Sequence, residues 1–236
     1  MLILGIDSSS LSASAALCEI DGGKINKYSV FSLKNGLTHS ENLLVIIDGA
    51  LSSLGVTAKD LDLIAVTAGP GSFTGVRIGV ATAKGLAFPY DTPVCGVSAL
   101  EAIALGQALP EGHAFPGGIV VPLLDARRSQ FYTAAFEGEN RLIPDSCLIF
   151  DDIYKRIKET GKSALLCGDG AELFYSLCED KTNIFTPPPS FTQSMASVAF
   201  LGYKKFLRGE HTSHYKLRPI YLRAPQAERE RLLKKN

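Results

Sequence analysis

The chain carries one pattern twice, and this repetition limits the folds open to it more than any other feature. Residues 2–19, LILGIDSSSLSASAALCE, run as an apolar strand, an aspartate, a turn of small residues and a second strand. Residues 118–137, GIVVPLLDARRSQFYTAAFE, follow the same plan, so Asp7 and Asp125 fall at equivalent points. A buried strand that leads into a glycine turn and a helix also follows in each half. These matches predict an internal duplication of a β-β-β-α-β-α unit.

Two such units facing each other predict a duplicated two-lobe α/β fold of the actin-like kind (ASKHA, ribonuclease H-like). The alternative is a single doubly wound sheet. With 236 residues, the chain is long for one compact unit and short for two independent domains. We place the N-terminal lobe at residues 1–109, the C-terminal lobe at 110–217 and a basic tail at 218–236. The Pro/Gly-rich segment PEGHAFPGG (110–118) is the expected crossing between the lobes.

Three helices are predicted in the first lobe, the last of them a short one around residues 99–108. Thr38 and Glu41 fit a capping box, and the helix behind them ends at Gly55. Its apolar residues form a stripe that is wider than one buried face requires. A second helix, from about residue 74 to 88, follows the loop AGPGSFTGVRIG (68–79).

This glycine-rich loop first suggests a phosphate-binding turn. It has no lysine to reach a terminal phosphate, and its spacing matches neither the P-loop nor the dinucleotide fingerprint. The small residues Gly75, Gly79, Ala83 and Ala87 instead recur every four positions along the helix. Because each helical glycine costs about 1 kcal/mol relative to alanine, a packing reason is expected. The stripe packs either on the protein's own sheet or against a helix of another protein.

The aspartate turns are the candidate remnants of a nucleotide site. In a duplicated ATPase fold, the aspartate after the first strand holds hydrated Mg²⁺ and the turn offers N–H groups to phosphate. The first turn lacks the glycine that close backbone approach favours, whereas CGDG (167–170) has two. Both turns alternatively only cap strand ends. The candidate nucleotide-binding residues are Asp7, Ser8, Ser9, Asp125, Gly168, Asp169 and Gly170.

No complete catalytic or metal-binding set is evident. The four histidines include one close pair, His211 and His214, with only Glu210 near it as a further ligand. No G-x-S-x-G elbow is present, so serine hydrolysis has no support. The five cysteines are scattered and form no C-x-x-C pair. We therefore expect neither a catalytic residue nor a metal site.

Composition and charge favour a cytoplasmic protein. Lysine plus arginine equals aspartate plus glutamate at 24 each, so the chain as a whole is no polyanion binder. Residues 216–236, however, carry seven basic and two acidic residues, which indicates a solvated terminus or an RNA contact. The N-terminus resembles neither a signal peptide nor a membrane anchor, and the mainly apolar surroundings of the cysteines favour a reducing compartment.

Several motifs in order resemble the TsaB (YeaZ) family of the tRNA threonylcarbamoyladenosine pathway. They are ILGIDSS, LTHSENLL, AGPGSFTGVRIG, LLDARRSQFY and PIYLRAPQAE, and they extend over nearly the whole chain. The resemblance implies a non-catalytic paralogue of the transferase TsaD, which it binds and activates. With the ATPase TsaE, that pair modifies the adenosine 3′ to the anticodon in tRNAs that read codons beginning with A. TsaD's metal site uses an H-x-x-x-H pair, of which this chain offers His39 alone, with Leu43 four residues on.

The resemblance also implies where partners bind. The helices after LTHSEN and after GPGSFTG form the TsaD interface, and the same surface makes a homodimer when TsaD is absent. ATP or ADP belongs to the assembled complex, with no cofactor of the chain's own, and tRNA is contacted indirectly or through the basic tail. The implied partner and dimer interface comprises Thr38, His39, Asn42, Ile46, Phe73, Gly75, Val76, Gly79, Val80 and Ala83.

Two other functions remain open from the residues. An independent actin-fold ATPase or kinase would use Asp7, Asp125 and the glycines of CGDG. A metalloprotease-like hydrolase would require bound zinc.

Overall fold

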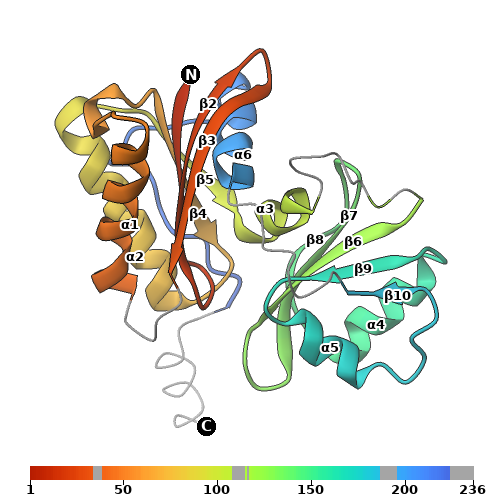
Figure 1. The fold of residues 1–236 in the computed structure, drawn as a ribbon. Coiled ribbons are helices and arrows are strands. Elements are labelled where there is room, and N and C mark those ends of the chain that lie inside the picture. Colours follow the sequence, from red (N-terminus) through yellow and green to blue (C-terminus); the bar gives the residue numbers. More distant parts are fainter. Residues whose placement is uncertain (34–38, 108–114, 116, 187–195, 224–236) are drawn as a thin grey trace, which may run out of the picture.

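The protein is built from two five-stranded sheets of identical topology (Figure 1). The structure, a computed structural model, describes residues 1–33, 39–107, 115, 117–186 and 196–223. The first sheet has the order β3-β2-β1-β4-β5, and the second has the order β8-β7-β6-β9-β10 when taken from its opposite edge. In each sheet the first three strands pair antiparallel and the last two join in parallel. The predicted duplication and the actin-like α/β class are confirmed.

The strands of each sheet follow the chain in the same relative order. Those of the first sheet are β1 (Leu2–Asp7), β2 (Ala13–Asp21), β3 (Lys24–Leu33), β4 (Leu63–Gly69) and β5 (Val94–Ser98). Those of the second sheet are β6 (Ile119–Asp125), β7 (Gln130–Glu137), β8 (Asn140–Ile149), β9 (Ala164–Cys167) and β10 (Ile184–Phe185). Asp7 and Asp125 therefore end the two central strands, β1 and β6, as the repeat predicts.

Two helices cover one face of the first sheet. They are α1 (His39–Ser53) and α2 (Phe73–Ala87), which is capped by the Ser72 hydroxyl and continues into the 3-10 turn η2 (Phe88–Tyr90). A further 3-10 turn, η1 (Ala58–Asp60), precedes β4. The buried sides of α1 and α2 share one apolar core with β1, β2 and β4. Thr38, the predicted cap of the first helix, lies outside the described residues.

The other face of the first sheet is covered by a helix from late in the chain. α6 (Ala196–Leu207) packs on β1, β2 and β4 and shares a core with them. Residues 196–217 therefore belong to the first lobe, and the predicted C-terminal lobe at 110–217 is wrong at its end. The reason is physical: the apolar face that β1, β2 and β4 leave open needs a cover, and α6 supplies it.

The second sheet is covered by helices of both halves. α4 (Phe150–Glu159) and α5 (Ala171–Leu177) cover one face, while α3 (Ala99–Gly106), which follows β5, packs on β6 and β7 from the other. Figure 1 shows α3 between the two sheets. Leu100 is fully buried there, in a core with Leu124 and Ala134 of the second sheet. This helix therefore joins the lobes into one body.

Candidate functional site

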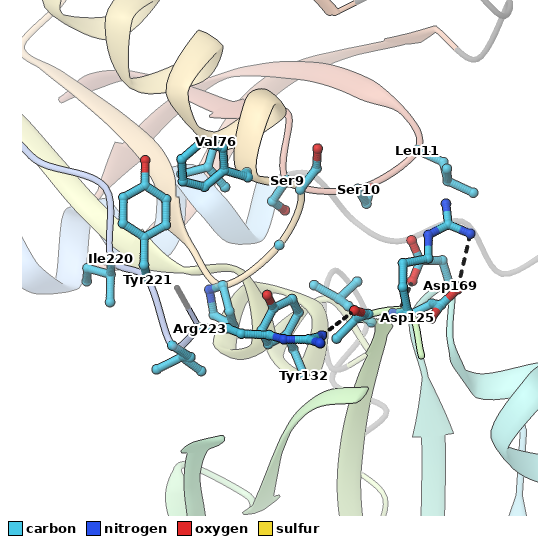
Figure 2. Close-up of a pocket in the computed structure, with 18 of the residues that line it drawn as sticks. Ser9, Ser10, Leu11, Val76, Asp125, Tyr132, Asp169, Ile220, Tyr221 and Arg223 are labelled. Atoms are coloured by element: carbon cyan, nitrogen blue, oxygen red, sulfur yellow. Dashed lines mark hydrogen bonds and ion pairs between the residues drawn. The ribbon is translucent and has the colours of Figure 1, made fainter. Parts of the chain in front are cut away.

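A cavity of about 360 Å³ lies between the two lobes at the carboxyl ends of the central strands. Figure 2 shows Ser9 and Ser10 of the first lobe on one side, with Asp125 and Asp169 of the second lobe on the other. This is where the repeat places the two aspartate turns. The carboxyl ends of parallel strands are the usual place for ligands in open α/β sheets, so this cleft is the first candidate site.

The first turn is engaged within the protein. Asp7 is 5% exposed, and its Oδ1 accepts hydrogen bonds from the Ser9 N–H (2.8 Å), the Ser9 hydroxyl (2.6 Å) and the Thr67 hydroxyl (2.7 Å). The Ser8 hydroxyl donates to the carbonyl oxygen of Gly75 at 2.8 Å. Of the three predicted residues, only Ser9 lines the described cavity. The N–H group of Ser9 is already taken by Asp7 and is not offered to a phosphate.

The second turn is engaged in a similar way. The N–H group of Gly170 donates to the carbonyl oxygen of Leu123 at 3.0 Å, and a β-carbon at Gly168 would overlap that same oxygen. These glycines therefore let the turn approach the end of β6. The sequence predicts that these glycines form a wall for phosphate. Such a wall would use the N–H group of Gly170, which already donates to Leu123.

The carboxylates of the second lobe do face the cavity. Asp169 accepts the N–H of Asp125 at 3.1 Å, and Asp125 accepts the N–H of Arg127 at 2.7 Å and pairs with its guanidinium at 3.5 Å. Asp169 keeps a solvent-accessible edge, but its enclosure by the cleft raises its pKa, and the nearby Asp125 carboxylate adds to this effect. The second wall thus contains an acidic pair, with the Arg127 guanidinium bound to Asp125.

The glycine loop closes over the first turn. The N–H of Ser72 donates to the carbonyl oxygen of Ser9 at 2.7 Å, and a β-carbon at Gly71 would overlap that oxygen. A β-carbon at Gly75 would overlap the Ser8 carbonyl oxygen, and one at Gly79 would overlap the Ser8 hydroxyl. The small-residue stripe therefore serves close packing within the protein. Of the two alternatives left open by the sequence, packing on the protein's own sheet is the one observed.

Most of the predicted interface residues are consequently unavailable to a partner. They are buried against the sheet and include Asn42, Ile46, Gly75, Val76, Gly79, Val80 and Ala83. His39 is half-buried, and its Nε2 donates to the carbonyl oxygen of Ser10 at 2.8 Å. Phe73 is half-buried beneath the Arg77 guanidinium, 3.8 Å from its ring centre. These residues position α1 and α2. The prediction that the seven buried residues contact a partner at the surface is wrong, because a stripe of small residues can pack against any close neighbour.

The exposed side of the same two helices carries residues that the sequence reasoning missed. Leu44 is 58% exposed and Val45 is 66% exposed on the outer side of α1, which packs beside α2. On α2, Arg77 and Ala81 are exposed, and Gly85 faces open space. The sequence feature that indicates these residues is the apolar stripe of α1, which is wider than one buried face requires. The apolar residues in excess of that face, Leu44 and Val45, lie on the surface.

Among the residues that the structure describes, no three His, Cys, Asp or Glu side chains gather as metal ligands would. His211 stacks on Phe206, whereas His214 is buried between Phe88 and Tyr215. His113 lies outside the described residues. No helix in the described part of the chain is long and apolar enough to cross a bilayer.

Comparison with known proteins gives the family. The model of the TsaD family, tRNA N6-adenosine threonylcarbamoyltransferase, matches residues 35–205. The tRNA threonylcarbamoyladenosine biosynthesis protein TsaB of Bacillus subtilis (strain 168) is 33% identical over 97% of this chain and 96% of its own length. TsaB of Escherichia coli (strain K12) is 25% identical over 94% of this chain and 95% of its own.

Solved structures agree on the fold. A Pseudomonas aeruginosa protein described as similar to peptidase YEAZ superposes with a TM-score of 0.77 at 22% identity, over 94% of this chain and 99% of that one. The polyphosphate/ATP-glucomannokinase of Arthrobacter sp. strain KM gives 0.50 at 11% identity, over 88% and 99%. The sequence matches extend over both lobes and include the turns and helices that shape the cleft. This chain belongs to the TsaB (YeaZ) family.

Proposed function

We propose that this chain is a non-catalytic partner that binds and activates a TsaD-type transferase in the formation of N6-threonylcarbamoyladenosine in tRNA. The full-length similarity to TsaB proteins of two organisms supports the pathway. The observation that carries the partner role is the outer side of α1, where Leu44 and Val45 expose large apolar side chains.

The proposed docking face consists of Leu44, Val45 and Asp48 on α1 with Arg77 and Ala81 on α2, all of them exposed. Adjacent positions 44 and 45 lie on the side of α1 opposite to its buried residues. An apolar centre with a charged rim is the usual composition of a protein interface. In the absence of the partner, the same docking face would pair two copies of this chain.

The cleft supports a role without chemistry of the chain's own. The Oδ1 oxygen of Asp7 already accepts three hydrogen bonds, and the N–H groups of Ser9 and Gly170 already have acceptors. These named groups of the two turns are therefore engaged within the protein, whereas an ATPase would use such groups to hold nucleotide and metal. Within the proposal, ATP or ADP is held only by the assembled complex, and TsaE supplies the ATPase.

The remaining parts of the proposal concern location and tRNA. The assembly acts in the cytoplasm, away from membranes, where its tRNA substrate is found. The chain contacts tRNA through the assembled complex or through its basic C-terminal residues. These features accompany the partner role.

Reconstitution tests the proposal. TsaD, TsaE, unmodified tRNA, ATP and the threonylcarbamoyl donor are combined with and without this chain, and the modified nucleoside is measured by mass spectrometry. The expected result is modification only when TsaD and this chain are both present. Modification by this chain without TsaD, or full activity of TsaD without this chain, would contradict the proposal.

A further inference from the structure

The segment 218–223 runs along one wall of the cleft between the lobes. It leaves the first lobe at Leu217, which is buried in the core beneath α1 and α2. Ile220, Tyr221, Leu222 and Arg223 then line the inter-lobe cavity. Figure 2 shows this segment along one side of the cavity, with Arg223 extending toward the second lobe. Of the predicted basic tail at 218–236, residues 220–223 therefore line the cleft, with Ile220 and Tyr221 still exposed and Leu222 and Arg223 half-buried.

One end of the segment is held by the backbone of the first lobe. The N–H of Ile220 donates to the carbonyl oxygen of Ala68 at 2.7 Å. A β-carbon at Gly69, whose φ is +127°, would overlap the carbonyl oxygen of Ile220. The first glycine of the loop AGPGSFTG thus provides the space in which the segment passes, and it does so in a backbone conformation that favours glycine.

The middle of the segment is held by α2. The Tyr221 ring lies 4.8 Å from the Phe73 ring, centre to centre, and the Nε of Arg77 donates to the Tyr221 hydroxyl at 2.7 Å. The Arg77 guanidinium also covers the face of Phe73. The aromatic contact and the charge-assisted hydrogen bond hold Tyr221 directly, and the contact with Phe73 helps to hold Arg77 in place.

Among the residues that the structure describes, the far end of the segment reaches the second lobe through the Arg223 side chain. The guanidinium of Arg223 donates to the carbonyl oxygen of Ala126 at 2.8 Å (Figure 2). Ala126 begins a turn in which Arg127, Arg128 and Ser129 all have positive φ, between 56° and 63°. Such a conformation costs roughly 1–2 kcal/mol for each L-residue other than glycine. The carbonyl held by Arg223 therefore stands at the entrance of a strained turn.

We infer that residues 218–223 form a clasp that ties the two lobes together along one wall of the cleft and limits how far the cleft opens. The clasp is anchored to Ala68 and α2 on one side and to Ala126 on the other. When Arg223 releases Ala126, the second-lobe wall loses its link to the segment and the cleft can widen. This inference concerns the folded chain itself and does not depend on the partner or the pathway.

Hydrogen exchange measured by mass spectrometry on the full chain tests the clasp. Arg223→Met keeps the aliphatic stem and removes the donor, whereas Arg223→Lys keeps a cation that can still donate. The matched control is Arg218→Met, because the described bonds of Arg218 go to the carbonyl oxygens of Tyr215 and Leu217, which precede the segment, and not to the second lobe.

The expected result is roughly tenfold or greater acceleration of exchange in peptides covering 125–130 and 218–223 in Arg223→Met, the size expected for a lost bond to a charged group. Arg223→Lys should recover most of the protection, and Arg218→Met should leave the 125–130 peptide unchanged. Unchanged exchange at 125–130 in Arg223→Met would overturn the inference. So would equal acceleration in the central strands β1 and β6, because Arg223 would then support the fold as a whole.

Discussion

The Ser8 hydroxyl donates to the carbonyl oxygen of Gly75 at 2.8 Å, and the Ser8 carbonyl oxygen occupies the space that a side chain at position 75 would need. The first turn of α2 thus rests directly on the turn after β1. This contact explains why a glycine lies inside the helix, and no bound ligand is needed to account for it. The loop that looked like a phosphate cradle is a close packing contact between two parts of the same lobe.

Substitution of Gly75 by alanine should therefore be destabilising. Its β-carbon meets backbone rather than a flexible side chain, and we expect a loss of about 2–4 kcal/mol in the free energy of unfolding. Gly85 is the matched control in the same helix, because nothing lies within 4 Å of its β-carbon position. Gly85→Ala should stabilise by about 0.5–1 kcal/mol through helix propensity. Urea denaturation compares the two, and equal effects would refute the packing argument.

Asp7→Ala should also lower stability, because three donors lose their shared acceptor. We expect a loss of about 2–3 kcal/mol, seen as a lower urea midpoint. The same preparation should show no change in ATP hydrolysis, which we expect to stay at the blank level in the wild-type chain. Mg²⁺-dependent turnover that is lost in Asp7→Ala would instead favour the independent ATPase.

Ser129→Gly should stabilise the protein. Ser129 is exposed and has a φ of +56°, a conformation that glycine adopts without the steric cost carried by other residues. The gain expected is about 1 kcal/mol, reduced somewhat by the greater freedom of glycine in the unfolded chain. Thermal unfolding measures it. A lower midpoint for Ser129→Gly would show that the side chain contributes more than the backbone conformation costs.

Thiol reactivity should be low in the folded protein. Burial raises the pKa of the Cys18 thiol to about 12, and it also raises the pKa values of Cys95, Cys167 and Cys178. Because of these raised pKa values, few of these thiols are ionised at pH 8. Their reaction is then slow, because the thiolate is the reactive form. Ellman's reagent should label the half-buried Cys147 first and reach all five cysteines only after denaturation. Rapid labelling of two or more thiols in the native protein would contradict this.

The duplicated architecture could be predicted because its signal is local. Each central strand is a short apolar run that ends in aspartate and a small-residue turn, so Asp7 and Asp125 mark the same point twice. The return of α6 to the first sheet could not be predicted in this way. It depends on which apolar face is left uncovered after both sheets have formed, and no local pattern in 196–207 records that.

The candidate surfaces also show that local sequence patterns are predictable, whereas the neighbours they meet in the fold are not. Periodicity located the stripe of Gly75 and Gly79 but could not identify its neighbour, because a small residue accommodates backbone and foreign helix equally well. The exposed pair Leu44 and Val45 accounts for the excess width of the apolar stripe on α1, but the width alone does not identify which residues of the stripe are exposed. The clasp at 218–223 had no signal, since a basic composition is typical of a solvated terminus.

The most direct test of the partner role is the affinity of TsaD for a variant of the docking face. Leu44→Glu with Val45→Glu places two charges at its centre, and we expect TsaD binding measured by calorimetry to weaken at least about a hundredfold. The matched control is Leu173→Glu with Leu177→Glu on α5 of the second lobe, where the two side chains are 48% and 47% exposed. The account predicts that this control binds TsaD like the wild type. Unchanged affinity of the docking-face variant, with its fold intact by circular dichroism, would contradict the account.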